Sequence, residues 1–153
     1  MKLFGMMALA AGALMTAGVA LAESPFDGAV AARKAVMGLR GFNIGQLAGM
    51  AKGDVPYDAA AAQAAADNLL VLANINMMAM WPPGSDSTSI TGTNALAAIW
   101  AEGSTIGEKA GAHTEAAKAM QAAAGVDLAS LQGGMEALGG SCGGCHKEFK
   151  ASQ

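Results

Sequence analysis

The stretch LASLQGGMEALGGSCGGCHKEF, residues 128–149, contains the most regular apolar repeat in the chain. Apolar residues recur there at spacings of three and four, at Leu128, Leu131, Met135, Leu138, Cys142, Cys145 and Phe149. Such a period is typical of a helix with one face in a protein core. Asp127, directly before the stretch, is a favourable N-cap. The sequence therefore predicts a last helix that carries both cysteines on its core-facing side.

Cys142, Cys145 and His146 form a Cys-x-x-Cys-His motif near the end of this helix. The spacing is the attachment signature of a c-type haem, in which each thiol bonds a vinyl group and the adjacent imidazole binds the iron. A zinc site would need a fourth ligand, and His113 is the only other histidine. A dithiol redox motif usually lies at a helix N-terminus. We therefore expect one covalent haem c, with His146 as proximal iron ligand.

Residues 1–22 have the pattern of a secretory signal peptide. Lys2 precedes an uncharged apolar run, and Ala20-Leu21-Ala22 is a small-x-small cleavage site. A retained membrane anchor is the alternative, but the run is short for a membrane span and adjoins the cleavage site. Cleavage after Ala22 would leave residues 23–153 as one exported domain, and the short signal favours a bacterial periplasm.

The composition restricts the class of protein. The 153-residue chain has a net charge of −3, which becomes −4 without Lys2. This small acidic excess argues against nucleic-acid binding. The exported residues fit one domain with one core, and none of their segments is apolar and long enough for a membrane span. No acid–base or nucleophile constellation accompanies the haem motif, so we do not expect an enzyme.

Turn residues divide the exported part into four predicted helices. Alanine is abundant while β-branched and aromatic residues are sparse, which favours helices over strands. We predict helices over 26–52, from after Asp58 to about Met80, from after Asn94 to about Ala124, and from after Asp127 onward. Mostly short connections indicate an all-α antiparallel four-helix bundle, with the haem near the C-terminal end of the last helix.

The pattern as a whole resembles the class II cytochromes c, that is, cytochrome c′ and its low-spin relatives. A haem motif at the C-terminal end of a four-helix chain is typical of that family. Three further segments are similar to family elements: Arg33-Lys34-Ala35-Val36-Met37, the turn over 51–58, and Ala98-Ile99-Trp100. Phe149 and Lys150 match the residues that follow the motif, although many members have arginine in place of Lys150.

The resemblance implies roles for individual residues. His146 would bind the iron, and Met37 would cover the opposite, distal face. Arg33 would lie near a haem propionate. Lys34 stands where many members have a glutamine that contacts the haem. Asn94, which we also predict as an N-cap, would touch a propionate.

The residues alone leave other roles open. Met37 fits an ordinary core methionine as well as a distal position. Arg33 fits a solvated arginine whose stem covers apolar surface as well as a propionate partner. His113 fits a hydrogen-bonded residue at a helix seam better than a second iron ligand. Trp81 and Trp100 are expected to close the end of the bundle by core packing.

Two functions follow from the sixth iron position. If the Met37 sulfur binds the iron, the haem is low-spin and the protein carries electrons. If Met37 only covers the iron, the haem is five-coordinate and binds NO or CO, for gas binding or NO protection. A binding module without haem is the third class, and it predicts a colourless protein.

Expected partners are small redox proteins or diatomic gases. The resemblance also implies a homodimer through the first two helices, where small residues permit close contact: Ala31, Gly38, Gly45 and Gly49.

Overall fold

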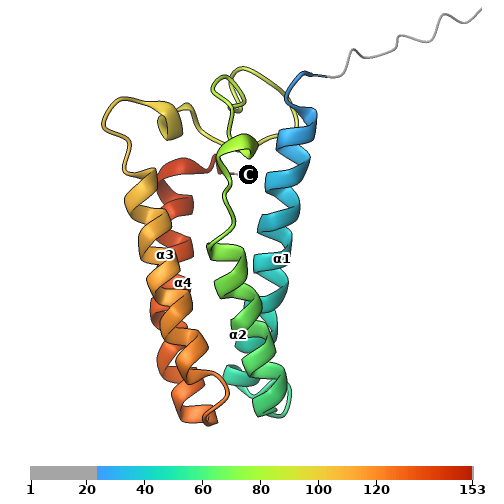
Figure 1. The fold of residues 1–153 in the computed structure, drawn as a ribbon, viewed down its shortest axis with the longest axis vertical. Coiled ribbons are helices and arrows are strands. Elements are labelled where there is room, and N and C mark those ends of the chain that lie inside the picture. Colours follow the sequence, from blue (N-terminus) through green and yellow to red (C-terminus); the bar gives the residue numbers. More distant parts are fainter. Residues whose placement is uncertain (1–23, 153) are drawn as a thin grey trace, which may run out of the picture.

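The protein is an up-and-down antiparallel bundle in the computed structural model, which describes residues 24–152. The predicted signal peptide and its cleavage site therefore lie outside the described residues. The four α-helices are α1 (Asp27–Lys52), α2 (Ala59–Ala73), α3 (Ile106–Ala123) and α4 (Leu128–Phe149) (Figure 1). Two short 3-10 helices, η1 (Met78–Met80) and η2 (Ala97–Trp100), lie between α2 and α3. The predicted fold class is confirmed, and none of the helices within residues 24–152 meets the length and apolarity of a membrane span.

α2 and α4 begin where Asp58 and Asp127 predict a helix start. The side chain of Asp58 accepts a hydrogen bond from the Ala61 N–H at 2.8 Å, and that of Asp127 accepts one from the Ser130 N–H at 2.7 Å. Each carboxylate satisfies a backbone donor that the first turn of its helix leaves free. Gly53 ends α1 in the left-handed conformation at φ 80°, which glycine adopts without steric cost.

The prediction that α2 continues to about Met80 was wrong. Asn74 ends the helix, and its side-chain amide donates to the Leu70 carbonyl at 2.8 Å. A second carbonyl of the last turn, that of Leu72, accepts a hydrogen bond from Arg40 Nη2 at 2.8 Å. These side chains satisfy carbonyls that would otherwise need another helical turn, so the helix stops there.

The prediction that the third helix starts after Asn94 was also wrong. α3 begins at Ile106, and Gly103, which lies inside the predicted helix, is an exposed turn residue at φ 74°. A left-handed residue interrupts any helix, so only the short η2 forms before it. Asn94 is therefore no helix N-cap, and its backbone carbonyl instead accepts a hydrogen bond from the Ala151 N–H at 2.8 Å.

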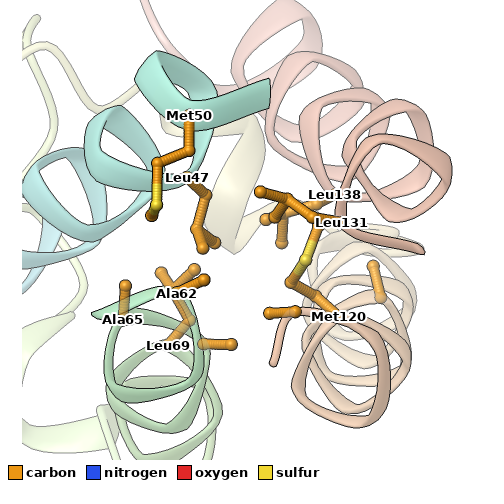
Figure 2. Packing of buried hydrophobic residues seen from close by; sticks show 11 residues of the cluster. Leu47, Met50, Ala62, Ala65, Leu69, Met120, Leu131 and Leu138 are labelled. Atoms are coloured by element: carbon orange, nitrogen blue, oxygen red, sulfur yellow. The ribbon is translucent and has the colours of Figure 1, made fainter. Parts of the chain in front are cut away.

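The main hydrophobic core lies in the half of the bundle where α1 ends and α4 begins. Figure 2 shows Leu47 of α1 directed toward Leu69 of α2, with Met120, Leu131 and Leu138 on the α3–α4 side. These five side chains are fully buried. This core holds the four helices together at one end and leaves the opposite end, where α1 begins and α4 ends, for the candidate site.

Candidate haem site

The Cys-x-x-Cys-His motif lies in the last turns of α4, which remains helical to Phe149. Cys142 and Cys145 are free thiols and half-buried, whereas His146 is exposed. Their spacing of three and four residues places them on one side of the helix. Burial raises the pKa of the Cys145 thiol, and the neighbouring Cys142 adds to the rise. Burial and then Lys150 lower the pKa of His146, which favours the neutral imidazole that binds a metal.

The zinc alternative lacks ligands in the part of the chain that the structure describes. No three His, Cys, Asp or Glu side chains gather there in a metal-binding arrangement. His113 does approach the motif, with Nδ1 4.0 Å from the Cys142 sulfur, but that nitrogen is engaged by Ser141. The same two cysteines thus remain available for thioether formation.

Cys145 packs against an apolar cluster at this end of the bundle. The buried members are Ala95, Ile99 and Phe149, and Trp81 and Trp100 pack against them. The centroids of the two indole rings lie 6.3 Å apart, and Trp100 Nε1 donates a hydrogen bond to the Trp81 carbonyl at 3.0 Å. The two tryptophans therefore pack together at the end of the bundle, as predicted, and form an aromatic wall for a large apolar cofactor.

Backbone pairing fastens the segment before η2 to the end of α4. Ala95 and Lys150 form an antiparallel bridge, and the Leu96 N–H donates to the Phe149 carbonyl at 2.9 Å. This pairing is long-range and has no sequence signature. It holds the aromatic wall against the helix that carries the motif.

Arg33 is buried, with 3% of its surface exposed. Its Nη1 donates to the Ser85 hydroxyl at 2.7 Å, and its Nη2 donates to the Ser85 carbonyl and to the Thr93 hydroxyl at 2.5 Å each. The guanidinium also lies over the Trp81 ring, 4.7 Å from its centroid. Burial lowers the pKa of Arg33. The solvated-arginine interpretation was therefore wrong, while a contact with a haem propionate stays a prediction.

The loop over 81–94 has an internal hydrogen-bond network that sequence reasoning missed. The Asp86 carboxylate accepts hydrogen bonds from the backbone N–H and hydroxyl of both Thr88 and Ser89. These bonds lower the pKa of Asp86 to about 2. The run Ser85-Asp86-Ser87-Thr88 was the available signal, because Asp and Ser side chains commonly bond backbone groups two or three residues on.

The structure gives the positions of three other residues that were predicted to lie near the haem. Met37 is half-buried, and it lies on the same face of α1 as Arg33 because the two are four residues apart. Lys34 is exposed and donates through Nζ to the Gly92 carbonyl at 3.3 Å. Asn94 is exposed. The roles of Met37, Lys34 and Asn94 toward haem stay predictions.

Two buried side-chain nitrogens, one on His113 and one on Arg40, have no hydrogen-bond partner in the described part of the chain. His113 is 8% exposed, and its Nδ1 lies 3.1 Å from the Ser141 hydroxyl, which donates its proton to the Leu138 carbonyl at 2.7 Å. His113 Nδ1 therefore carries a hydrogen, so in the neutral ring Nε2 is a bare acceptor. Within residues 24–152, this Nε2 and Arg40 Nε are the buried side-chain nitrogens and oxygens without a hydrogen bond.

These features together fit a haem. Buried polar atoms are rarely left unpaired in a complete protein. One of the two unpaired atoms belongs to His113, whose ring lies beside Cys142, and the other belongs to Arg40 on the Met37 face of α1. Sequence reasoning missed Arg40, although its position three residues after Met37 placed it on the same face of α1.

Comparison with known proteins decides the family. The sequence profile described as Cytochrome C' matches residues 28–150. The chain belongs to the cytochrome c′ family. Cytochrome c-554 of Cereibacter sphaeroides is 44% identical over 118 residues, which are 77% of this chain and 89% of that relative. A solved cytochrome c′ from Rhodobacter is 36% identical with a TM-score of 0.82, and the match covers 85% of this chain and 100% of the other.

A third relative, the cytochrome c′ from Alcaligenes xylosoxidans, has been solved as variants with nitric oxide and with carbon monoxide bound. It is 27% identical to this chain with a TM-score of 0.72, and the match covers 84% of this chain. Members of the cytochrome c′ family carry covalently attached haem c, so the predicted cofactor is confirmed. The cytochrome c′ relatives share the four-helix bundle described above.

Proposed function

We propose that this member of the cytochrome c′ family is an exported mono-haem cytochrome that transfers single electrons in the periplasm. When bound, the haem supplies a reversible one-electron centre. The observation that carries the proposal is the pair of free, half-buried thiols with an adjacent imidazole at the end of α4. Cys142 and Cys145 hold the macrocycle, and His146 is the proximal ligand.

The surroundings of the motif suit electron transfer. The aromatic wall of Trp81 and Trp100 excludes water on the side of Cys145. Arg33 and the hydrogen bonds of Asp86 hold the loop that covers this end of the bundle. A rigid environment keeps the reorganisation that accompanies electron transfer small.

A bond between the Met37 sulfur and the iron distinguishes electron transfer from gas binding. A thioether sulfur is a suitable sixth ligand for haem iron, and Met37 is half-buried on the face of α1 that also carries Arg33 and Arg40. Gas binding is the second candidate because the Alcaligenes xylosoxidans relative has been solved with nitric oxide and with carbon monoxide. In that case Met37 covers an open iron site without a bond.

Absorbance spectra of protein expressed with haem maturation test the proposal. We expect a sharp low-spin spectrum in the oxidised and reduced protein that CO does not change. A broad high-spin Soret band that shifts with CO would replace electron transfer by gas binding. No haem spectrum at all would contradict both candidates and favour a binding module without haem.

We also propose that two copies associate through α1 and α2. Phe42 and Val71 are 64% and 65% exposed, and Leu39 is exposed beside them. A shallow groove of about 230 Å³ between the two helices includes Leu39 and Val71 in its lining. Exposed apolar side chains gathered on one face are typical of an interaction surface.

Export is the remaining part of the proposal. The signal pattern of residues 1–22 supports removal of this segment after Ala22. Mass spectrometry of protein recovered from the periplasm should give a chain that starts at Glu23 and carries one haem. A chain that keeps Met1 would contradict export by cleavage.

A further inference from the structure

Arg40 lies on the face of α1 that is directed to the haem site. It follows Met37 by three residues and Arg33 by seven, and helical periodicity places all three on one side. The Arg40 side chain is half-buried, and its Nε is fully buried without a partner. Burial lowers the pKa of Arg40, while Cys142 and Cys145 counteract that shift. The guanidinium therefore belongs to the side of α1 that carries Met37, between the main core at Leu47 and the start of the helix.

No carboxylate of the described chain neutralises this cation. Within residues 24–152, the ion pairs join Lys109 to Glu148 and Lys118 to Glu115. Arg40 instead has two uncharged partners through Nη2, the Leu72 carbonyl at 2.8 Å and the Met77 sulfur at 3.8 Å. A half-buried charge that lacks a compensating anion keeps its full electrostatic effect on nearby groups, because nothing of opposite sign offsets it.

His113 does not supply that compensation. The hydrogen bond to Ser141 keeps the hydrogen on His113 Nδ1, and burial followed by the charge of Arg40 lowers the His113 pKa. The ring is therefore neutral and adds no charge of either sign. One full positive charge remains on this face of α1, at the end of α2.

We propose that Arg40 is a residue that raises the reduction potential of the haem, because its unneutralised charge on the Met37 face of α1 disfavours the ferric state. The inference rests on the proposed haem protein and deepens it. Reduction removes one positive charge from the iron centre, so a nearby cation stabilises the reduced form. Inside a protein this interaction is much stronger than in water, and buried charge is one of the means by which a protein sets a haem potential.

Capping of α2 is a second role of the same side chain, and it must be separated from the electrostatic one. The hydrogen bond to the Leu72 carbonyl needs only an N–H donor, which a glutamine amide also provides. Arg40→Gln therefore removes the charge and keeps a donor for the cap. Arg40→Lys keeps both the charge and a donor.

Spectroelectrochemical titration of the haem protein measures the effect. We expect Arg40→Gln to lower the midpoint potential by about 59 mV, a tenfold change in the equilibrium constant of a one-electron couple. Arg40→Lys should stay closer to the wild-type potential. Lys118→Gln is the matched control, because it removes an exposed positive charge that pairs only with Glu115 on α3, and it should leave the potential unchanged.

Two results would overturn the inference. One is an Arg40→Gln protein with an intact haem spectrum and the wild-type potential. The other is a crystal structure of the wild-type haem protein in which a carboxylate of the chain or a haem propionate binds the Arg40 guanidinium. This structure tests whether the charge is unneutralised even if Arg40→Gln does not fold. A wild-type protein without a haem spectrum would contradict the proposed function itself.

Discussion

Arg33 of α1 and Ser85 of the long loop are joined by two hydrogen bonds, from Nη1 to the Ser85 hydroxyl at 2.7 Å and from Nη2 to the Ser85 carbonyl at 2.5 Å. Ser85 is fully buried. The charged donor thus satisfies both buried acceptors of one residue, and hydrogen bonds to a charged group are stronger than those between neutral groups. This contact connects the first helix to the loop that closes the haem end of the bundle.

Arg33→Ala should destabilise the protein because it leaves the two Ser85 oxygens buried without their donor. Hydrogen bonds to charged groups contribute about 1.5–3 kcal/mol each, so we expect a loss of roughly 3 kcal/mol in the free energy of unfolding. Urea denaturation measures it. Lys34→Ala removes one exposed hydrogen bond to the same loop and should change stability by less than about 0.5 kcal/mol. Equal losses of stability in the two variants would show that the buried Arg33 contacts contribute no more than the exposed Lys34 hydrogen bond.

Asp86 makes the stability of the loop dependent on pH in the acid range. Hydrogen bonds from Thr88 and Ser89 lower its pKa from 3.8 to about 2, so the ionised form is favoured in the folded state. Its contribution is complete above about pH 4 and is lost as the pH falls toward 2. The Tm of Asp86→Asn should therefore lie below that of the wild type at pH 7 and approach it near pH 2. Asp54→Asn, at an exposed position, serves as the control, and a difference that does not depend on pH would refute this role of Asp86.

Gly134 of α4 lies against Met120 of α3 in the main core. A Cβ added there would lie 2.8 Å from the Met120 methyl group, whereas one added at Gly133 would meet no atom within 4 Å. We expect Gly134→Ala to cost about 1–2 kcal/mol through overpacking, reduced by the flexibility of methionine. Gly133→Ala should stabilise α4 by about 0.5–1 kcal/mol, because alanine is the better helix former. Denaturant titration of the pair tests the packing, and similar changes in both variants would contradict it.

Met37→Ala should change the ligation of the iron. If the sulfur is the sixth ligand, the variant loses it, and a low-spin spectrum becomes a high-spin spectrum that responds to CO. Met78→Ala is the matched control, since Met78 is an exposed methionine outside the site. An unchanged low-spin spectrum in Met37→Ala would assign the sixth position to another group.

Phe42→Glu should convert a dimer into a monomer. The change places a charge on the exposed apolar face of α1 without touching the buried core. Sedimentation velocity at micromolar concentration measures the result. Val126→Glu is an appropriate control, because Val126 is also exposed but lies in the turn between α3 and α4. A wild-type protein that sediments as a monomer would contradict the proposed association.

Local signals explain most of the correct predictions. The apolar period of residues 128–149 and the caps Asp58 and Asp127 act within one turn of the chain, and the structure has them as expected. One error occurs where a partner distant in sequence contributes to the boundary, and the other where a glycine takes up the left-handed conformation, which the sequence permits but does not require. Arg40 binds a carbonyl at the end of α2, which stops before Met80, and Gly103 turns the chain so that the third helix starts late.

Local patterns of the sequence specify the fold class, the course of α1 and α4, and a haem motif on the core side of the last helix. These follow from spacing and capping, which are properties of neighbouring residues. The positions of the arginines of α1 depend on the folded chain, because Ser85 and Leu72 reach Arg33 and Arg40 from distant parts of the sequence. The same holds for His113 Nε2 and Arg40 Nε, which have no hydrogen-bond partner within residues 24–152. The energy of a buried polar group depends on what the folded chain brings to it, and no local pattern contains that information.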